Sequence, residues 1–304
     1  MVKESNDKRW DERSIPDLTG RNIIVTGANS GIGFEAAKAM AGRGATIVMA
    51  CRNIEKSADA FDKVRQESHN DKVELMRLDL ADLSSVREFA GEAREKFPLI
   101  DILVNNAGIM VPPYGRTIDG FELQIGTNHL GHFLLTGLLM ENIVAAPGSR
   151  VVTVTSIAHF GGRINFEDIN SETGYRRMGA YRQSKLANLL FSYELDRRLK
   201  EKEKETISVA VHPGVTSTSI FKMPSWLERV KEAILMSSAK GALPTLMGAT
   251  EPSLKGGEYI GPAGFRQSMG YPAILSSSNR SHDRQLALRL WELSEEMTSF
   301  RFSI

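Results

Sequence analysis

Short apolar runs rich in β-branched residues alternate along this chain with longer segments whose apolar residues recur every three to four positions. The short runs cover residues 22–26, 46–50, 73–78, 102–105, 150–155 and 207–212. The longer segments cover residues 33–43, 54–67, 84–97, 121–140 and 181–201. Continuous apolar strands separated by helices are typical of a parallel sheet that is covered on both faces. The pattern therefore predicts an α/β fold, a doubly wound domain with a mainly parallel sheet of about seven strands between helix layers.

The ends of the chain and two irregular stretches complete this outline. We expect residues 1–18 to form a polar arm, residues 19–304 to form one domain, a last strand near 258–260 and a closing helix over 281–298. Residues 158–179 and 215–248 interrupt the alternation, and long excursions often serve as lids or binding loops. Residues 225–238 within the second excursion are amphipathic with a mixed-charge polar face, which favours a substrate lid over contact with a membrane surface.

Composition narrows the class of protein. Of 304 residues, 41% are hydrophobic and 25% are charged, and the net charge of +1 gives no global attraction to nucleic acid. The single cysteine, Cys51, rules out an internal disulfide bond. The charged start and the absence of any long apolar run predict a cytoplasmic protein with neither a secretory signal nor a membrane span.

A glycine-rich turn joins the first predicted strand to the first predicted helix. It reads Thr26-Gly27-Ala28-Asn29-Ser30-Gly31-Ile32-Gly33. Glycines let the backbone turn sharply and let a pyrophosphate approach the N-terminus of the helix, where free N–H groups and the helix dipole attract it. A glycine-rich turn without a ligand is the alternative, and the position between strand and helix argues against it.

The ends of the next two strands bear on the choice of cofactor. Arg52 follows the second strand, where an acidic residue would hold the ribose 2′-hydroxyl of NAD; a cation there can instead pair with the 2′-phosphate of NADP. A solvated charge at the end of a strand is the other interpretation. Asp79, after the third strand, can reach the adenine or can cap the following helix.

Tyr181 and Lys185 are four residues apart, so on a helix they share one face. A phenol with a pKa of about 10 is a poor base at neutral pH. An ammonium at about 5 Å, with an effective dielectric near 20, would lower that pKa by about two units. The sequence thus predicts a tyrosine prepared for proton transfer. For the pair alone, a half-buried aromatic beside a solvated lysine remains the simpler interpretation.

Further segments turn this pair into a pattern: Asn105-Asn106-Ala107-Gly108, Asn128-His129-Leu130-Gly131-His132-Phe133, Thr155-Ser156, Tyr181-Arg182-Gln183-Ser184-Lys185 and His212-Pro213-Gly214. In order and in position relative to the strands, they resemble the short-chain dehydrogenase/reductase superfamily over about residues 18–262. The exact residues of several segments are similar to those of the branch of the retinol dehydrogenases and WW-domain oxidoreductase-like proteins. That branch also has a long gap between its serine and tyrosine segments. The resemblance implies a Rossmann-type fold.

The resemblance also implies roles for individual residues. The catalytic set would be Asn128, Ser156, Tyr181 and Lys185, with Tyr181 as the general acid/base, Ser156 bonded to the substrate oxygen, and Asn128 supporting a water next to Lys185. Lys185 would also hold the nicotinamide ribose. The cofactor would lie against Gly27, Asn29, Ser30, Gly31, Ile32, Gly33, Arg52, Asn53, Asp79, Leu80, Asn105, Ala107, Gly108, Tyr181, Lys185, Pro213, Gly214, Val215 and Thr218.

These observations predict an oxidoreductase that transfers a hydride between a nicotinamide cofactor, NADP(H) in preference to NAD(H), and a hydrophobic ketone, aldehyde or alcohol. A short-chain epimerase or dehydratase and a non-catalytic NADP-binding sensor or scaffold are the alternatives. We expect a small-molecule carbonyl or alcohol as partner, no nucleic acid, and leave assembly into homo-oligomers open. We expect no metal, because His129 and His132 lack a carboxylate or cysteine partner at ligand spacing.

Overall fold

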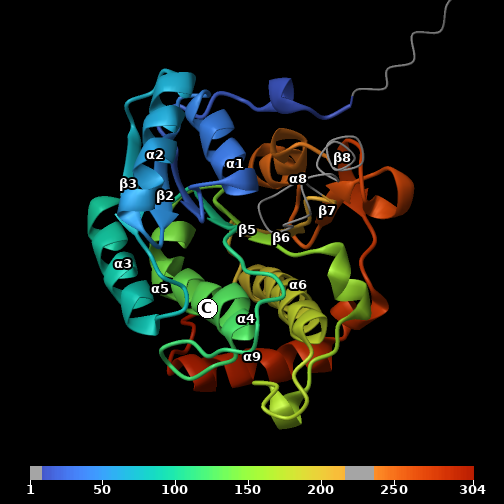
Figure 1. Ribbon diagram of the computed structural model, residues 1–304. Coiled ribbons are helices and arrows are strands. Elements are labelled where there is room, and N and C mark those ends of the chain that lie inside the picture. The colour runs from blue at the N-terminus through green and yellow to red at the C-terminus, as the bar shows by residue number, and fades with distance from the viewer. Residues whose placement is uncertain (1–8, 216–235) are drawn as a thin grey trace, which may run out of the picture.

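The computed structural model describes residues 9–215 and 236–304. Within them the chain forms an eight-stranded sheet in the order β3-β2-β1-β4-β5-β6-β7-β8 (Figure 1). The strands are β1 (Asn22–Thr26), β2 (Thr46–Cys51), β3 (Val73–Arg77), β4 (Ile102–Asn105), β5 (Arg150–Val154), β6 (Ile207–Val211), β7 (Tyr259–Pro262) and β8 (Pro272–Leu275). Neighbouring strands from β3 to β7 run parallel, and β8 pairs antiparallel with β7.

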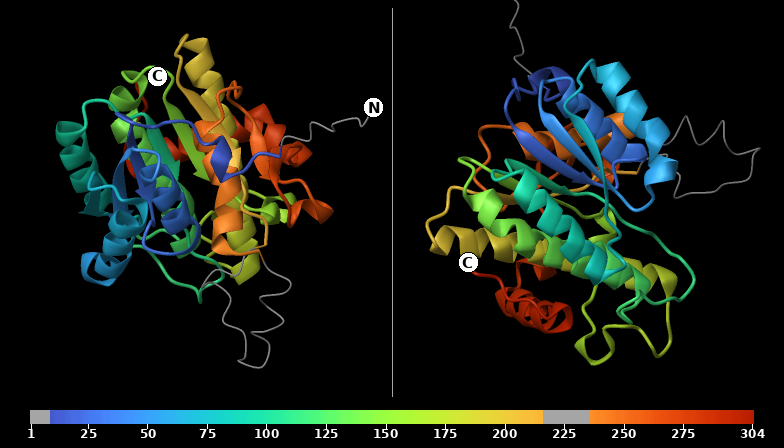
Figure 2. Two further views of the ribbon diagram at one scale, coloured as in Figure 1. Left: turned by 90° about the horizontal axis from the view of Figure 1, so that it is seen from above. Right: turned by 90° about the vertical axis from the view of Figure 1, so that its left-hand side faces the viewer.

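Helices cover both faces of the sheet, as Figure 2 shows. One face carries α1 (Gly31–Ala41), α2 (Ile54–Ser68) and α8 (Ser238–Thr250), whose apolar side chains form one core cluster with the sheet. The other face carries α3 (Leu83–Lys96), α5 (Gly131–Val144) and α6 (Arg177–Glu201), and α9 (Arg284–Thr298) packs on the outside of α6. The predicted doubly wound architecture is confirmed.

One helix of the second layer changes its winding near its start. The short α4 (Leu123–Ile125) continues through a π-helical turn, η2 (Gly126–Leu130), into α5. In this turn the N–H of Gly131 donates to the carbonyl of Gly126, five residues earlier. Such turns insert one extra residue into a helix and often occur at functional sites.

The sheet has one strand more than the sequence pattern predicts. The additional strand, β8, spans four residues, begins with Pro272, and lies at the edge of the sheet. A short edge strand that begins with proline carries almost no periodic signal, because proline is tolerated only at edges and strand starts. It is also antiparallel, so it does not follow the strand–helix alternation on which the count rests.

The proposed excursion over residues 215–248 ends in a core helix. α8 begins at Ser238, capped by Ser237, and buries most of its residues between α1 and the sheet. Its glycines and Pro244 obscure the helical spacing in the sequence, which explains the difference. The other excursion, 158–179, contains the short 3₁₀ turns η3 (Ile157–Gly161) and η4 (Phe166–Asp168), and its last three residues already belong to α6. Most of the amphipathic stretch 225–238 lies outside the described residues.

The N-terminal arm is less polar in its contacts than in its composition. Trp10, Ile15 and Leu18 are buried in the core cluster on the α1 and α8 face. The indole Nε1 of Trp10 donates to a carboxylate oxygen of Glu251 at 3.1 Å, just past the end of α8. Residues 10–18 are therefore part of the packed molecule. None of the helices in the described ranges has the length and apolar character needed to cross a bilayer.

Candidate active site

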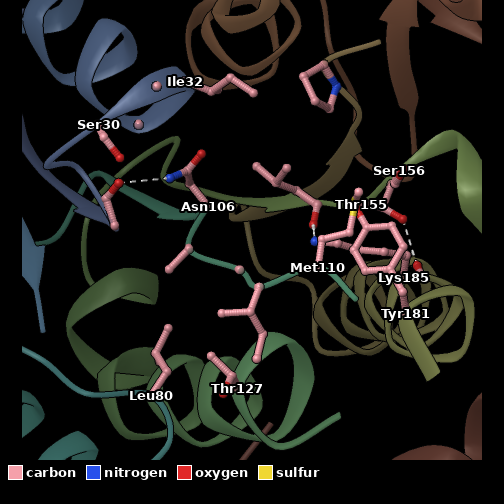
Figure 3. Close-up of a pocket in the computed structure, with 18 of the residues that line it drawn as sticks. Ser30, Ile32, Leu80, Asn106, Met110, Thr127, Thr155, Ser156, Tyr181 and Lys185 are labelled. Carbon is pink, nitrogen blue, oxygen red and sulfur yellow. Dashed lines mark hydrogen bonds between the residues drawn. The ribbon is translucent and has the colours of Figure 1, made fainter. Parts of the chain in front are cut away.

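A cavity of about 490 Å³ opens at the carboxyl ends of the parallel strands (Figure 3). β1 and β4 are neighbours in the sheet, with β2 and β3 on one side and β5 and β6 on the other. Doubly wound domains bind their ligands in the crevice at such a reversal of strand order. Loops after β1 to β6 and the first turns of α6 line the cavity. The fold thus brings together segments that are far apart in the sequence.

The turn after β1 has a shape that requires glycine. Gly27 and Gly31 have φ angles of +65° and +57°, in the left-handed region that side chains disfavour. A Cβ on Gly33 would lie 2.4 Å from Nδ2 of Asn106 and 2.5 Å from the carbonyl oxygen of Gly27. Any side chain at position 33 would therefore push the turn and the β4 loop apart.

The N-terminus of α1 faces this cavity. Ser30 stands at the capping position but its side chain makes no capping hydrogen bond. The first-turn N–H groups of a helix have no acceptor within the helix, and with the helix dipole they attract an anion. Asn29, Ser30 and Ile32 line the cavity together with the glycines of the turn.

Of the predicted residues after β2, only one reaches the cavity. Arg52 is exposed and lines it. The side chain of Asn53 instead caps α2, since its Oδ1 accepts a hydrogen bond from the N–H of Lys56 at 2.8 Å, and Asn53 is not among the lining residues. Asparagine is a favoured N-cap, which accounts for this arrangement.

Both predicted residues after β3, Asp79 and Leu80, line the cavity. The helix that follows is capped by another residue, Asp82, whose side chain accepts from the N–H groups of Ser84 and Ser85. The helix-capping interpretation of Asp79 is therefore wrong, because Asp82 caps this helix.

The two asparagines after β4 point in different directions. The side chain of Asn105 is buried and donates to Oγ1 of Thr136 in α5 at 2.9 Å. Asn106, Ala107 and Gly108 line the cavity, and Nδ2 of Asn106 donates to the carbonyl of Thr26 at 2.7 Å. Asn106 rather than the predicted Asn105 therefore lines the cavity, because successive side chains along a strand point to opposite faces.

Ser156, Tyr181 and Lys185 lie together at the other end of the cavity (Figure 3). The hydroxyl of Ser156 is hydrogen-bonded to the phenol of Tyr181. Nζ of Lys185 lies 5.9 Å from the centre of the Tyr181 ring and donates to the carbonyl of Val154 at 3.1 Å. Thr155 fixes the helix against β5 through a 2.6 Å bond from its Oγ1 to the carbonyl of Lys185.

Asn128 lies behind this group, in the π turn η2, and is fully buried. Its Oδ1 accepts from the N–H of Ile109 at 2.8 Å, and its Nδ2 donates to the carbonyl of Ile109 at 3.0 Å and to Oγ of Ser184 at 2.9 Å. A Cβ on Gly108 would lie 3.2 Å from Oδ1 of Asn128 and 3.4 Å from Nζ of Lys185. Asn128 therefore holds the cavity loop close to the lysine without lining the cavity itself.

Burial changes the acidity of both central groups. It lowers the pKa of Lys185 to about 8. It raises the pKa of Tyr181, against the opposing effect of the bond with Ser156. The predicted fall in the pKa of Tyr181 is therefore wrong for the protein without a bound cofactor. Burial destabilises the phenolate by more than the hydrogen bond with Ser156 stabilises it. At neutral pH Tyr181 is a protonated phenol.

The segment after β6 closes the cavity on the side of Ser156. Pro213, Gly214 and Val215 line it. Gly214 has a φ of +74°, and a Cβ there would lie 2.5 Å from the carbonyl oxygen of Ser268. Thr218, also named from the sequence, lies outside the described residues.

A buried histidine near Ser156, His159, was not predicted from the sequence. Nδ1 of His159 lies 2.7 Å from the carbonyl oxygen of Ser156, and its Nε2 accepts from the N–H of Ser278 at 3.1 Å. His159 thus ties the serine loop to a segment that is 119 residues away. Nothing in its local sequence distinguishes it from a surface histidine.

Comparison with known proteins identifies the family. The model of the short chain dehydrogenase family matches residues 21–225. The chain belongs to this family. Human retinol dehydrogenase 12 is 38% identical over 295 residues, which cover 95% of this chain and 90% of that protein. Human retinol dehydrogenase 13 is 48% identical over 204 residues, 67% of this chain and 61% of that protein.

Solved structures agree with this assignment. An uncharacterised protein from Mycobacterium paratuberculosis is 40% identical and aligns with a TM-score of 0.83 over 97% of this chain and 100% of its own. A short chain dehydrogenase from Shigella flexneri, complexed with NADP, shares the fold with a TM-score of 0.62 at 23% identity, over 80% of this chain and 97% of its own. The predicted superfamily and its retinol dehydrogenase-like branch are confirmed. The chain is an NAD(P)-dependent oxidoreductase acting on CH–OH or C=O groups.

The two histidines considered as metal ligands are both buried and bonded to protein groups. His129 meets Oγ of Ser294 in α9 at 2.9 Å, and His132 meets Oγ1 of Thr26 at 2.9 Å. Burial lowers their pKa values to about 3 and about 4. Across residues 9–215 and 236–304, no cluster of three or more His, Cys, Asp or Glu side chains is arranged to hold a metal ion.

Proposed function

We propose that this protein is an NADP-preferring reductase of hydrophobic ketones or aldehydes, and the corresponding alcohol dehydrogenase, with Tyr181 as its general acid/base. The observation that carries the proposal is the convergence of Ser156, Tyr181 and Lys185 at one end of the cavity, with a phosphate-type turn at the other end. Ile109, Ile157 and Met178 give the cavity an apolar wall near Ser156, which suits an apolar substrate.

The residues present fit a dinucleotide. The pyrophosphate would lie against the turn of Gly27, Gly31 and Gly33, where the absence of any Cβ leaves the backbone N–H groups accessible. When bound, the nicotinamide supplies or accepts the hydride. Arg52, which lines the cavity directly after β2, would pair with a 2′-phosphate, and neither Arg52 nor Asn53 is a carboxylate that would favour a free 2′-hydroxyl.

In reduction, Ser156 donates a hydrogen bond to the carbonyl oxygen of the substrate and Tyr181 gives its phenolic proton to that oxygen. The raised pKa of Tyr181 keeps that proton in place until it is needed. The phenolate left behind is stabilised by the positive charge of the Lys185 ammonium, whose Nζ lies 5.9 Å from the centre of the ring. In oxidation the same phenolate takes the hydroxyl proton of the alcohol.

The test is Tyr181→Phe, assayed by NADPH absorbance across a panel of apolar ketones and aldehydes. We expect kcat to fall at least hundredfold, as for loss of a general acid, while NADPH still binds. Tyr193→Phe is the matched control, because Tyr193 is also on α6 but hydrogen-bonds Ser277 away from the cavity. Turnover by Tyr181→Phe at the wild-type rate would contradict the proposal. NADPH binding without net turnover in the wild type would favour the epimerase or sensor alternatives.

Cofactor preference is tested separately with Arg52→Asp. Loss of a charge-assisted contact should weaken NADPH binding by roughly tenfold or more and leave NADH binding unchanged or improved. Arg77→Asp is the control, since Arg77 is exposed at the end of the neighbouring β3 and does not line the cavity. Equal effects of Arg52→Asp on both cofactors would refute the preference.

A further inference from the structure

His132 is buried on α5 between two segments that the active site depends on. Its Nδ1 lies 3.0 Å from the carbonyl oxygen of Asn128, and its Nε2 lies 2.9 Å from Oγ1 of Thr26, at the end of β1. Only 1% of its surface is exposed. The ring therefore spans the distance from the π turn to the strand that precedes the glycine turn.

The partners of the ring fix its tautomer. A carbonyl oxygen only accepts, so Nδ1 must carry the proton that it donates to Asn128. Oγ1 of Thr26 already accepts from the N–H groups of Asn106 and Ala107, both at 2.9 Å, which fills its two lone pairs. Thr26 is then left with its hydroxyl proton to donate, and Nε2 of His132 at 2.9 Å is a nearer acceptor than the carbonyl oxygen of Val104 at 3.3 Å. Nε2 therefore accepts this proton. The contacts at Asn128 and Thr26 thus favour the same neutral ring.

The result is a directed chain of hydrogen bonds around the loop after β4. Thr26 holds that loop at Asn106 and Ala107, and the Asn128 side chain holds it at Ile109. His132 connects these two holding points to each other. Burial and, to a smaller extent, the charge of Lys185 lower the pKa of His132, which keeps the ring in the neutral state that these hydrogen bonds need.

We infer that His132 is a positioning residue that braces Thr26 against Asn128 and so fixes residues 106–109 between the cofactor turn and Lys185. This inference rests on the proposed function, because it assigns that loop to the cofactor side of the site. His132 touches neither substrate nor cofactor, since it does not line the cavity. Its effect is exerted through the loop and through the backbone of Asn128.

Three variants separate the two halves of the brace. His132→Phe removes both bonds and keeps a ring. His132→Gln places an amide oxygen near the position of Nε2 and restores only the Thr26 contact, whereas His132→Asn places an amide N–H near Nδ1 and restores only the Asn128 contact. His129→Gln is the matched control, because His129 is a buried histidine of the neighbouring π turn whose bond goes to Ser294 in α9.

We expect His132→Phe to lower kcat roughly tenfold and to weaken NADPH binding roughly fivefold, the scale of one or two lost hydrogen bonds. His132→Gln should recover NADPH affinity with kcat still low, and His132→Asn should recover kcat with affinity still weak. His129→Gln should lower the melting temperature without separating the effect on kcat from the effect on NADPH affinity. A folded His132→Phe with wild-type kcat and NADPH affinity, or equal losses in all four variants, would overturn the inference.

Two readouts do not depend on turnover. The NADPH dissociation constants across the series can be measured by nucleotide fluorescence. The ¹⁵N shifts of His132 should show a protonated Nδ1 and an unprotonated Nε2, and the opposite tautomer would refute the brace. If the wild type reduces no carbonyl, the proposed function fails while these two measurements still decide the role of His132.

Discussion

Lys185 is a lysine whose side chain has little contact with water. Its side chain is almost fully buried, and burial lowers its pKa to about 8. The sequence predicts its place beside Tyr181, because four residues make about one helical turn. It does not predict the direction of the pKa changes, since burial depends on β5 and the π turn, which are distant in sequence. For the same reason the pKa of Tyr181 is raised rather than lowered.

This burial makes a prediction about stability. The pKa of Lys185 is lowered from 10.5 to about 8 in the folded protein, so the folded state binds the proton less tightly than the unfolded chain. The lysine therefore destabilises the protein fully below pH 8, by up to about 3 kcal/mol, and this penalty fades as the pH rises to about 10.5. Lys185→Met should raise the free energy of unfolding at pH 7 while abolishing catalysis.

The measurement is urea unfolding of wild type and Lys185→Met at several pH values between 7 and 10.5, because the difference between the two proteins isolates this group. Val154 keeps a partner in the variant, since its carbonyl also accepts from Asn188. Lys63→Met, at an exposed position of α2, should show no pH-dependent difference. A Lys185→Met protein that is less stable than wild type at pH 7 would contradict the prediction.

At the scale of elements, the strand ends are where the sequence is most informative. The bounds of β1 and β4 are predicted as observed, and those of the other parallel strands lie within one or two residues, because apolar runs end where polar site residues begin. The π turn and α8 were not predicted. A π turn has the composition of an α-helix, and its extra residue depends on tertiary contacts such as those of Asn128 and His132. Local spacing alone therefore gives the site residues but not their directions.

The glycine turn allows an element-scale prediction. In Gly33→Ala the added methyl group would lie 2.4 Å from Nδ2 of Asn106, so the turn must shift away from the β4 loop. We expect NADPH affinity to fall at least tenfold, measured by fluorescence, together with a lower melting temperature. Gly91→Ala, at an exposed helical position with no atom within 4 Å of the new Cβ, should bind normally and gain slightly in stability. Unchanged affinity in Gly33→Ala would show that the turn does not hold the nucleotide.

At the scale of the whole molecule, both ends of the described chain pack against the helix layers that cover the sheet. Trp10 reaches the end of α8, 241 residues away. Near the other end, Trp291 of α9 and Phe302 pack edge-on against Phe133 in α5. Neither contact can be derived from the sequence, because a charged arm and an amphipathic helix fit many surfaces equally well. The cavity is lined by residues between 27 and 215, and segments before and after this range support the fold around it.

The arm supports the fold without touching the site, and this distinction can be tested. Trp10 is 9% exposed and bonded to Glu251, so Trp10→Ala should lower the free energy of unfolding by about 3 kcal/mol through lost apolar contacts and the lost hydrogen bond to Glu251. Because Trp10 does not line the cavity, kcat per folded molecule and NADPH affinity should stay at wild-type values. Arg13→Ala, whose side chain is 90% exposed, removes only a surface ion pair and should leave the urea unfolding curve almost unchanged. Urea unfolding with assays at low denaturant separates these effects. If Trp10→Ala instead lowered NADPH affinity while leaving unfolding unchanged, the arm would have to be counted as part of the active site.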